Sequence, residues 1–269
     1  MKHLPLPSPA TSRIPTLRRL LCLGLLLLLV PLAAEAQRKK VGVVLSGGGA
    51  KGVAHIGVLQ VLEKAGIPVD VIVGTSMGSI VGGLYAIGYS ADQLDSLVRV
   101  QDWMFLLSDK VNRYDLPFGE KEQDGKYLLS LPFDRGKKRP SGFISGQNVY
   151  NLFSDLTVGY HDSLDFLQLP IPFACVAADL FQREEIVMTS GNLVQAMRAS
   201  MAIPGVFTPV RTGNRVLVDG GILNNFPTDV ARELGAEIVI GVDVQADLMK
   251  EDKLESVSGV IPQIINLLC

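Results

Sequence analysis

Cysteine and histidine are scarce in this 269-residue chain, which narrows the chemistry open to it. The three cysteines, Cys22, Cys175 and Cys269, are too scattered to indicate a disulfide framework. No cysteines or histidines have the spacing of a metal site, so we predict no metal and no other cofactor. The formal net charge is -2, with acids and bases spread along the chain. The missing basic stripe argues against nucleic acid as a partner.

The first 36 residues have the pattern of an export signal. Arginines precede an apolar run from Leu20 to Val30, and Ala34-Glu35-Ala36 fits a cleavage site. The run is shorter than the roughly 20 apolar residues that usually cross a bilayer. We predict a signal peptide over residues 1–36, with a retained anchor as the alternative. Either way the mature protein is exported, to the periplasm, outer membrane or extracellular space.

Beyond residue 36 the hydrophobic pattern alternates between buried strands and helices. Val41–Leu45 and Val69–Gly74 are almost continuous apolar runs, each followed by a helical pattern. This order is typical of a parallel sheet that is covered on both faces. We therefore predict one α/β domain over residues 37–269. The apolar end of the chain, ESVSGVIPQIINLLC, leaves open whether more chain follows.

Two local signals add detail to this pattern. Ser90 followed by Gln93 is typical of a capping box and predicts the start of a helix. The pair Gly213-Asn214 between two strand-like runs predicts a β-hairpin.

A segment rich in glycine, proline and charge, residues 109–146, interrupts the regular pattern. It is either a lid or binding loop, or a solvated connection. Its basic cluster, Arg135–Arg139, is either a solvated turn or a contact for lipid headgroups.

The stretch Gly74-Thr75-Ser76-Met77-Gly78 lies where an apolar strand meets a helix. This is the geometry of a nucleophile elbow, in which flanking glycines relieve the crowding of a sharp turn. Such a turn would place Ser76 Oγ at the carboxyl edge of the sheet, where open α/β folds bind ligands. The alternative is an ordinary strand-to-helix connection in which Ser76 caps the helix.

A glycine-rich loop, GGGAKG, follows the first strand. Gly47, Gly48 and Gly49 free the backbone to turn its N–H groups inward, as an oxyanion hole requires. Nucleotide binding is a weaker alternative, because the P-loop order is absent and a G-x-G-x-x-G match has only Asp70 as a ribose partner.

No histidine is well placed to take a proton from Ser76. His3 lies in the leader, His55 is expected to pack or cap a helix, and none follows His161. A Ser, Asp, His order of a triad would need a later histidine, which leaves His161 as a weak candidate base.

Asp219 offers a carboxylate instead. It ends the apolar run RVLV and precedes Gly220-Gly221, so its side chain can emerge at the sheet edge. A carboxylate there would be anionic at neutral pH and could accept the Oγ proton. The alternative is an aspartate that only caps a turn before glycines.

Four blocks in this order, GGGAKG, GTSMGS, ASMAIPGVF and DGG, resemble the patatin-like phospholipase family, including its bacterial, exported members. The resemblance covers the chain from about Val41 to Val244. It implies a three-layer α/β/α fold around a mainly parallel central sheet, and a Ser/Asp dyad without histidine. Ser76 is then the nucleophile, Asp219 its base, and the amides of Gly47, Gly48 and Gly49 the oxyanion hole.

The resemblance also assigns supporting residues and a function. Lys51 occupies the family's Lys/Arg position and orders the loop or meets a phosphate. The implied function is a serine lipid acyl hydrolase, a phospholipase A-type esterase that forms an acyl-enzyme on phospholipids or related lipid esters at a membrane surface. The alternative is a non-catalytic lipid-binding or envelope interaction domain on the same fold. The supporting motif residues are Lys51, Gly52, Gly74, Gly78, Gly220 and Gly221.

Overall fold

The computed structural model of the protein describes residues 38–111 and 142–245. The predicted signal peptide, the basic cluster Arg135–Arg139 and the apolar C-terminal end lie outside these residues, so what was predicted of them stays a prediction. The described residues from Lys40 onward pack as one unit. In neither described range is there a helix long and apolar enough to cross a membrane.

A seven-stranded sheet forms the centre of this unit. Its parallel part has the order β11, β1, β2, β5, and β6 and β10 then pair antiparallel with β5. The predicted hairpin is present, since β9 and β10 are antiparallel neighbours and Gly213 between them has φ 54°. The strands are β1 (Val41–Leu45), β2 (Val71–Thr75), β5 (Phe173–Asp179), β6 (Glu184–Met188), β9 (Val210–Thr212), β10 (Arg215–Asp219) and β11 (Ile238–Val242).

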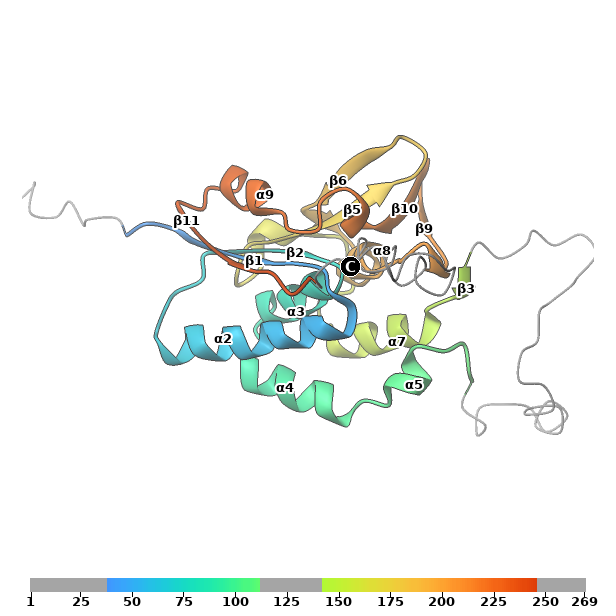
Figure 1. The fold of residues 1–269 in the computed structure, drawn as a ribbon, viewed down its shortest axis with the longest axis horizontal. Helices are drawn as coiled ribbons and strands as arrows, with labels where there is room; N and C mark the ends of the chain where they lie inside the picture. Colours follow the sequence, from blue (N-terminus) through green and yellow to red (C-terminus); the bar gives the residue numbers. More distant parts are fainter. Residues whose placement is uncertain (1–37, 112–141, 246–269) are drawn as a thin grey trace, which may run out of the picture. The chain divides into compact units, whose positions relative to one another are not determined.

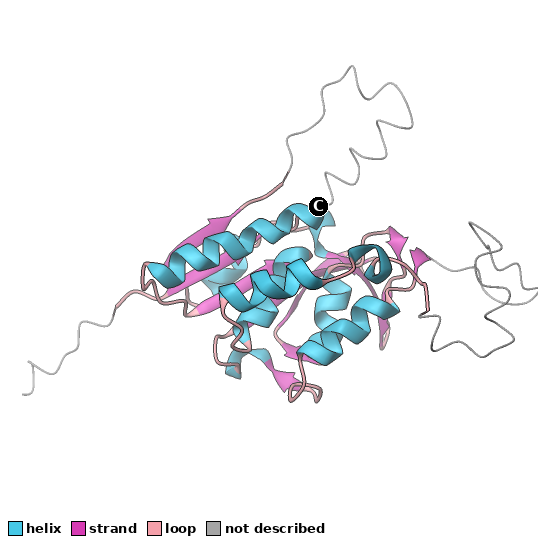
Figure 2. Ribbon diagram, turned by 90° about the horizontal axis from the view of Figure 1, so that it is seen from below, coloured by secondary structure: helices cyan, strands magenta, loops and turns pink. Residues whose placement is uncertain are grey.

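Helices cover both faces of the sheet. Val43 and Leu45 of β1 join a large core with helices on one face, whereas Val44 joins a smaller core with α9 on the other. Figure 1 shows α9 above the strands and α2, α3, α4 and α7 below them, and Figure 2 views this lower layer from below. The three-layer α/β/α prediction is therefore confirmed. The helices are α2 (Ala54–Lys64), α3 (Met77–Ala86), α4 (Ala91–Val100), α5 (Trp103–Leu106), α7 (Gln147–Leu156), α8 (Leu193–Ser200) and α9 (Thr228–Glu233).

Smaller elements complete the described fold. The predicted capping box is present at the start of α4, where Ser90 Oγ accepts the Gln93 amide and the Gln93 side chain accepts the Ser90 amide. Two short strand pairs and three 3-10 turns connect the main elements. They are β3 (Gly142–Ile144) with β8 (Gly205–Phe207), β4 (Leu164–Asp165) with β7 (Ser190–Gly191), and η2 (Gly49–Val53), η3 (Phe166–Gln168) and η4 (Gly220–Ile222).

Strand β5 brings the ends of two other strands together. Its residues 175–179 pair with β6 on one edge, so β2 and β10 must share the other edge. They approach from opposite directions: β2 ends with Thr75 opposite Val176, and β10 ends with Asp219 opposite Ala177. The residue after β2 is Ser76. The register of β5 therefore places Ser76 and Asp219 side by side, although 143 positions separate them.

The turn after β2 leaves no space for side chains at its glycines. A Cβ at Gly74 would overlap the Gly78 carbonyl group, and a Cβ at Gly78 would overlap the Leu45 carbonyl group at the end of β1. Helix α3 can therefore begin close against the sheet only because both positions are glycine.

We expect Gly78→Ala to lower the free energy of unfolding by about 1–3 kcal/mol, because the added methyl overpacks the backbone of β1. Gly57→Ala is the matched control, at an exposed helical glycine whose Cβ would meet nothing within 4 Å. It should raise stability by about 0.5–1 kcal/mol. Urea unfolding measures both changes, and equal midpoints for the two variants would contradict the packing argument.

Candidate active site

Ser76 has the backbone of a strained elbow. It lies between β2 and α3 with φ 53° and ψ -121°, a region that non-glycine residues rarely occupy. Its amide donates to Ser200 Oγ at 2.9 Å, and the Ser200 hydroxyl donates to the Val176 carbonyl at 2.6 Å. Helix α8 and β5 thus hold the turn in place. Ser76 is the N-cap residue of α3, as the helix-cap alternative has it, but its side chain makes no capping bond to the helix.

The Ser76 hydroxyl donates instead to Asp219 Oδ2 at 2.7 Å. Ser76 is 3% exposed and Asp219 is fully buried. The other carboxylate oxygen, Oδ1, accepts the Gly221 amide at 2.8 Å, and the Asp219 amide donates to the Ala202 carbonyl at 2.9 Å. Both sequence alternatives placed this carboxylate at a turn, and its two oxygens have different partners. One oxygen caps the turn and the other faces the serine.

Burial changes the acidity of Asp219. Removal from water raises its pKa to about 7, although the bonds from Ser76 and the Gly221 amide act in the opposite direction. From the sequence we expected a carboxylate that is simply anionic at neutral pH. The structure gives a group that exchanges its proton near neutrality, which is the range in which a general base is most effective.

The glycine loop after β1 lies next to this pair. The Gly47 amide donates to the Asn225 carbonyl at 3.1 Å, so this N–H already has an acceptor within the fold. The amides of Gly48 and Gly49 have no acceptor among the residues that the structure describes, and Gly49 has φ 52°. Of the three predicted oxyanion donors, only the Gly48 and Gly49 amides therefore remain available.

Buried contacts with His55 and Met77 hold this loop in place. His55 is fully buried and its Nε2 donates to the Ser46 carbonyl at 2.8 Å. Burial lowers the pKa of His55 and favours the neutral ring. A Cβ at Gly52 would overlap the Met77 side chain, which ties the loop to the start of α3. The prediction that His55 serves packing agrees with these contacts.

The other predicted motif residues have distinct positions. A Cβ at Gly220 would overlap the Val176 carbonyl, so only glycine lets the turn after β10 approach β5. Gly221 supplies the amide that binds Asp219. Lys51 is exposed on the turn η2, where its amide donates to the Gly48 carbonyl at 3.1 Å.

Two sequence alternatives do not fit the site. His161 is exposed and its Nε2 donates to the Ser154 carbonyl at 2.9 Å, while the Ser76 hydroxyl is bonded to Asp219. Asp70 precedes β2 and binds the Val41 amide at 2.7 Å. Because β1 and β2 are parallel, Asp70 lies at the opposite end of the strands from the glycine loop and cannot serve a nucleotide there. Within the described ranges, no histidine, cysteine and acidic side chains are grouped as metal ligands.

Ser200 and Asn225 belong to the site but were not found from the sequence. Ser200 lies in the block ASMAIPGVF and Asn225 follows the DGG block, so the motifs marked both segments without indicating a role. The Nδ2 and Oδ1 atoms of Asn225 are buried without a hydrogen-bond partner. A Cβ at Gly47 would overlap Asn225 Oδ1 and lie 3.3 Å from Ser76 Cβ, which places the amide beside the loop and the serine.

The fold and the site define a class of α/β protein with a serine at a strand-to-helix elbow and a buried carboxylate as its partner. The family model described as Patatin-like phospholipase matches residues 43–232. The chain belongs to the patatin-like phospholipase family.

Two relatives agree with this membership. Patatin-like phospholipase domain-containing protein 6 of Homo sapiens is 33% identical over 215 residues, which cover 79% of this chain and 14% of that protein. Lysophospholipase NTE1 of Debaryomyces hansenii is 32% identical over 218 residues, 79% of this chain and 12% of that protein. Among solved structures, VipD from Legionella pneumophila aligns with a TM-score of 0.49 and 18% identity over 76% of this chain and 49% of that chain. The chain thus spans only a small part of the length of the Homo sapiens and Debaryomyces hansenii relatives.

We expect Asp219→Asn to be more stable than the wild type at neutral and alkaline pH. The folded pKa of about 7 lies above the ordinary value of about 3.9, so the folded protein binds the extra proton between these pH values. Its stability therefore falls as the pH rises from about 4 to about 7. Asparagine does not titrate, so the gain in melting temperature over wild type should be larger at about pH 8 than at about pH 5. A gain that does not change with pH would refute the raised pKa.

Proposed function

We propose that this protein is an exported serine lipid acyl hydrolase, a phospholipase A-type esterase that uses Ser76 and Asp219. The observation that carries the proposal is the 2.7 Å hydrogen bond from the Ser76 hydroxyl to Asp219 within a buried site. Lipid esters are supported as substrates by family membership and by the names of the relatives, phospholipase and lysophospholipase. The pattern of residues 1–36 supports export.

The first half of the reaction forms an acyl-enzyme. Ser76 Oγ attacks the ester carbonyl carbon while its proton moves to Asp219 Oδ2. Negative charge then develops on the former carbonyl oxygen, where the free amides of Gly48 and Gly49 can donate. When the tetrahedral intermediate collapses, the carbon–oxygen bond of the ester breaks. The leaving alcohol takes the proton from Asp219.

The second half releases the fatty acid. Water attacks the acyl carbon and gives a proton to Asp219, which returns it to Ser76 Oγ as the acyl–serine bond breaks. A single carboxylate can serve as base and acid in turn because its pKa lies at about 7. Burial thus raises the pKa of Asp219 to a value close to that of a histidine in water.

A fluorophosphonate probe tests this proposal. We expect covalent labelling of the purified wild type and no labelling of Ser76→Ala, because the probe reacts only with an activated serine. Hydrolysis of phospholipid and lysophospholipid vesicles should fall by a factor on the order of 10⁴ in the same variant. Mass spectrometry of the released fatty acids would identify the acyl position that is cleaved.

Two variants serve as controls. Ser96→Ala removes an exposed serine and should leave labelling unchanged. His161→Ala should also keep full activity, and its loss would instead favour a histidine triad. A folded wild type that binds vesicles but shows neither labelling nor ester hydrolysis would support the non-catalytic lipid-binding alternative.

A further inference from the structure

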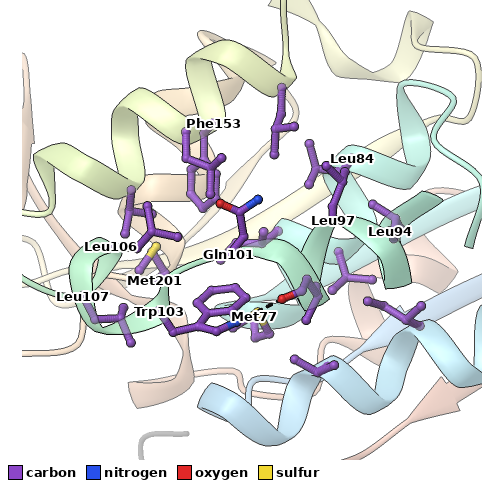
Figure 3. A pocket seen from close by; sticks show the side chains of 18 residues that line it. Met77, Leu84, Leu94, Leu97, Gln101, Trp103, Leu106, Leu107, Phe153 and Met201 are labelled. Atoms are coloured by element: carbon purple, nitrogen blue, oxygen red, sulfur yellow. Dashed lines mark hydrogen bonds between the residues drawn. The ribbon is translucent and has the colours of Figure 1, made fainter. Parts of the chain in front are cut away.

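An apolar pocket adjoins the candidate active site. Its cavity of about 80 Å³ lies between α2, α3, α4, α5 and α7. Figure 3 shows side chains pointing into it, among them Met77 at the start of α3 and Met201, which follows α8. Its 18 lining residues are Val53, Ile56, Met77, Ile80, Val81, Leu84, Leu94, Leu97, Val98, Gln101, Trp103, Leu106, Leu107, Val149, Leu152, Phe153, Leu156 and Met201.

The wall of this pocket is continuous with the nucleophile elbow. Met77 is the residue after Ser76 and the first of α3. Met201 follows Ser200, whose hydroxyl accepts the Ser76 amide. A chain attached to a carbonyl carbon at Ser76 Oγ therefore has an apolar path beginning at the next residue.

The lining excludes polar ligands. Of its 18 residues, only Gln101 and Trp103 carry side-chain nitrogen or oxygen. The Trp103 indole N–H is already used, because it donates to the Val98 carbonyl at 3.1 Å, the dashed line in Figure 3. An occupant must therefore be held by burial of apolar surface, at about 25 cal/mol for each Å² removed from water.

Apolar side chains continue from the pocket to the surface. Around the turn from α4 to α5, Val100 is 76% exposed, Trp103 37%, Met104 84% and Leu107 46%. Trp103 and Leu107 belong both to the pocket lining and to this exposed rim. Exposed apolar groups beside an apolar pocket are expected where a ligand arrives from a lipid phase.

We propose that this pocket binds the fatty acyl chain of the ester and that Leu97 and Trp103 limit its length. The inference rests on the proposed function, because that function places the acyl carbon of the ester at Ser76 Oγ. A cavity of about 80 Å³ is smaller than the roughly 150 Å³ that accommodates a benzene ring. The pocket as seen here therefore holds the first few carbons, and a longer chain must extend past Trp103 onto the rim. Short and medium acyl chains are favoured.

The protein's single tryptophan makes binding directly observable. Trp103 lines the pocket, so a bromine atom on a bound acyl chain should quench its fluorescence. We would titrate Ser76→Ala with a brominated decanoic acid below its micelle concentration. Saturable quenching, reversed by unbrominated decanoic acid, is the expected result. Absence of saturable quenching would overturn the proposal.

The dependence of ester hydrolysis on acyl-chain length tests the role of Leu97 in the pocket. Leu97→Phe fills the pocket and should lower the ratio of kcat/KM for p-nitrophenyl octanoate to that for the acetate by a factor of about 10. Val61→Phe is the matched control on the exposed face of α2, where the side chain is 62% exposed. It should leave the ratio unchanged.

The outcomes separate the two proposals. Ester hydrolysis with the same ratio in Leu97→Phe and wild type would overturn the pocket assignment and leave the hydrolase proposal standing. Saturable quenching without any Ser76-dependent hydrolysis would leave the pocket standing and overturn the hydrolase.

We also infer, from a separate observation, that Asn225 donates to the reacting ester. Its Nδ2 and Oδ1 atoms are buried without partners among the described residues, its amide group lies beside Gly47, and Gly47 lies beside Ser76. A polar group left unpaired in this way costs about 1–3 kcal/mol. An ester oxygen that becomes an oxyanion at Ser76 would accept the N–H and remove this cost. This inference likewise rests on the proposed function.

Asn225→Ala should lower kcat for p-nitrophenyl acetate by a factor of about 100 with little change in KM, as for other oxyanion donors. Its melting temperature should rise, because an unpaired buried group is removed; a structural residue would behave in the opposite way. Asn224→Ala is the neighbouring control, whose side chain donates to Glu185 and Asp229. It should lower the melting temperature and keep kcat. A destabilised Asn225→Ala with wild-type kcat would overturn the assignment.

Discussion

The hydrogen bond between Ser76 and Asp219 depends on a shared edge of β5. Strands β2 and β10 approach along that edge from opposite directions and stop at adjacent positions, Val176 and Ala177. Side chains alternate between faces along a strand, so a slip of β10 by one residue would turn Asp219 to the other face. The register of an antiparallel pair is thus as much a requirement of the site as the two side chains themselves.

Burial of this pair has consequences in two directions. It raises the pKa of Asp219 to about 7, which gives a carboxylate the proton affinity of a base near neutral pH. It also demands that the remaining polar groups be satisfied, and the Gly221 amide and the Ser200 hydroxyl meet that demand. The Asn225 side chain remains without a hydrogen-bond partner in the described part of the chain, and its Oδ1 lies beside Gly47. The same enclosure thus raises the pKa of the carboxylate and leaves a buried amide side chain unpaired.

Much of this arrangement was predictable because its signals are local. The elbow at Ser76, the capping box at Ser90 and the hairpin at Gly213 each depend on residues that are neighbours in sequence. The sequence did not show that the Gly47 amide is already bonded while the Gly48 and Gly49 amides are not bonded to any described residue. That difference depends on the Asn225 carbonyl, which lies far along the chain. The shift in the Asp219 pKa was missed for the same reason: it is a property of enclosure by several elements, which no spacing in the sequence records.

Helix α3 joins Ser76 to the pocket proposed for the acyl chain. Its first residue, Met77, follows Ser76, and Ile80 and Leu84 continue along the same face into the pocket at helical spacing. Because glycine contacts fix the start of α3 against β1, this wall cannot move without disturbing the serine. The wall formed by α4 and α5 carries neither Ser76 nor Asp219. We therefore expect substitutions in α4 and α5 to change which acyl chain fits the proposed pocket, while Ser76 and Asp219 keep their geometry.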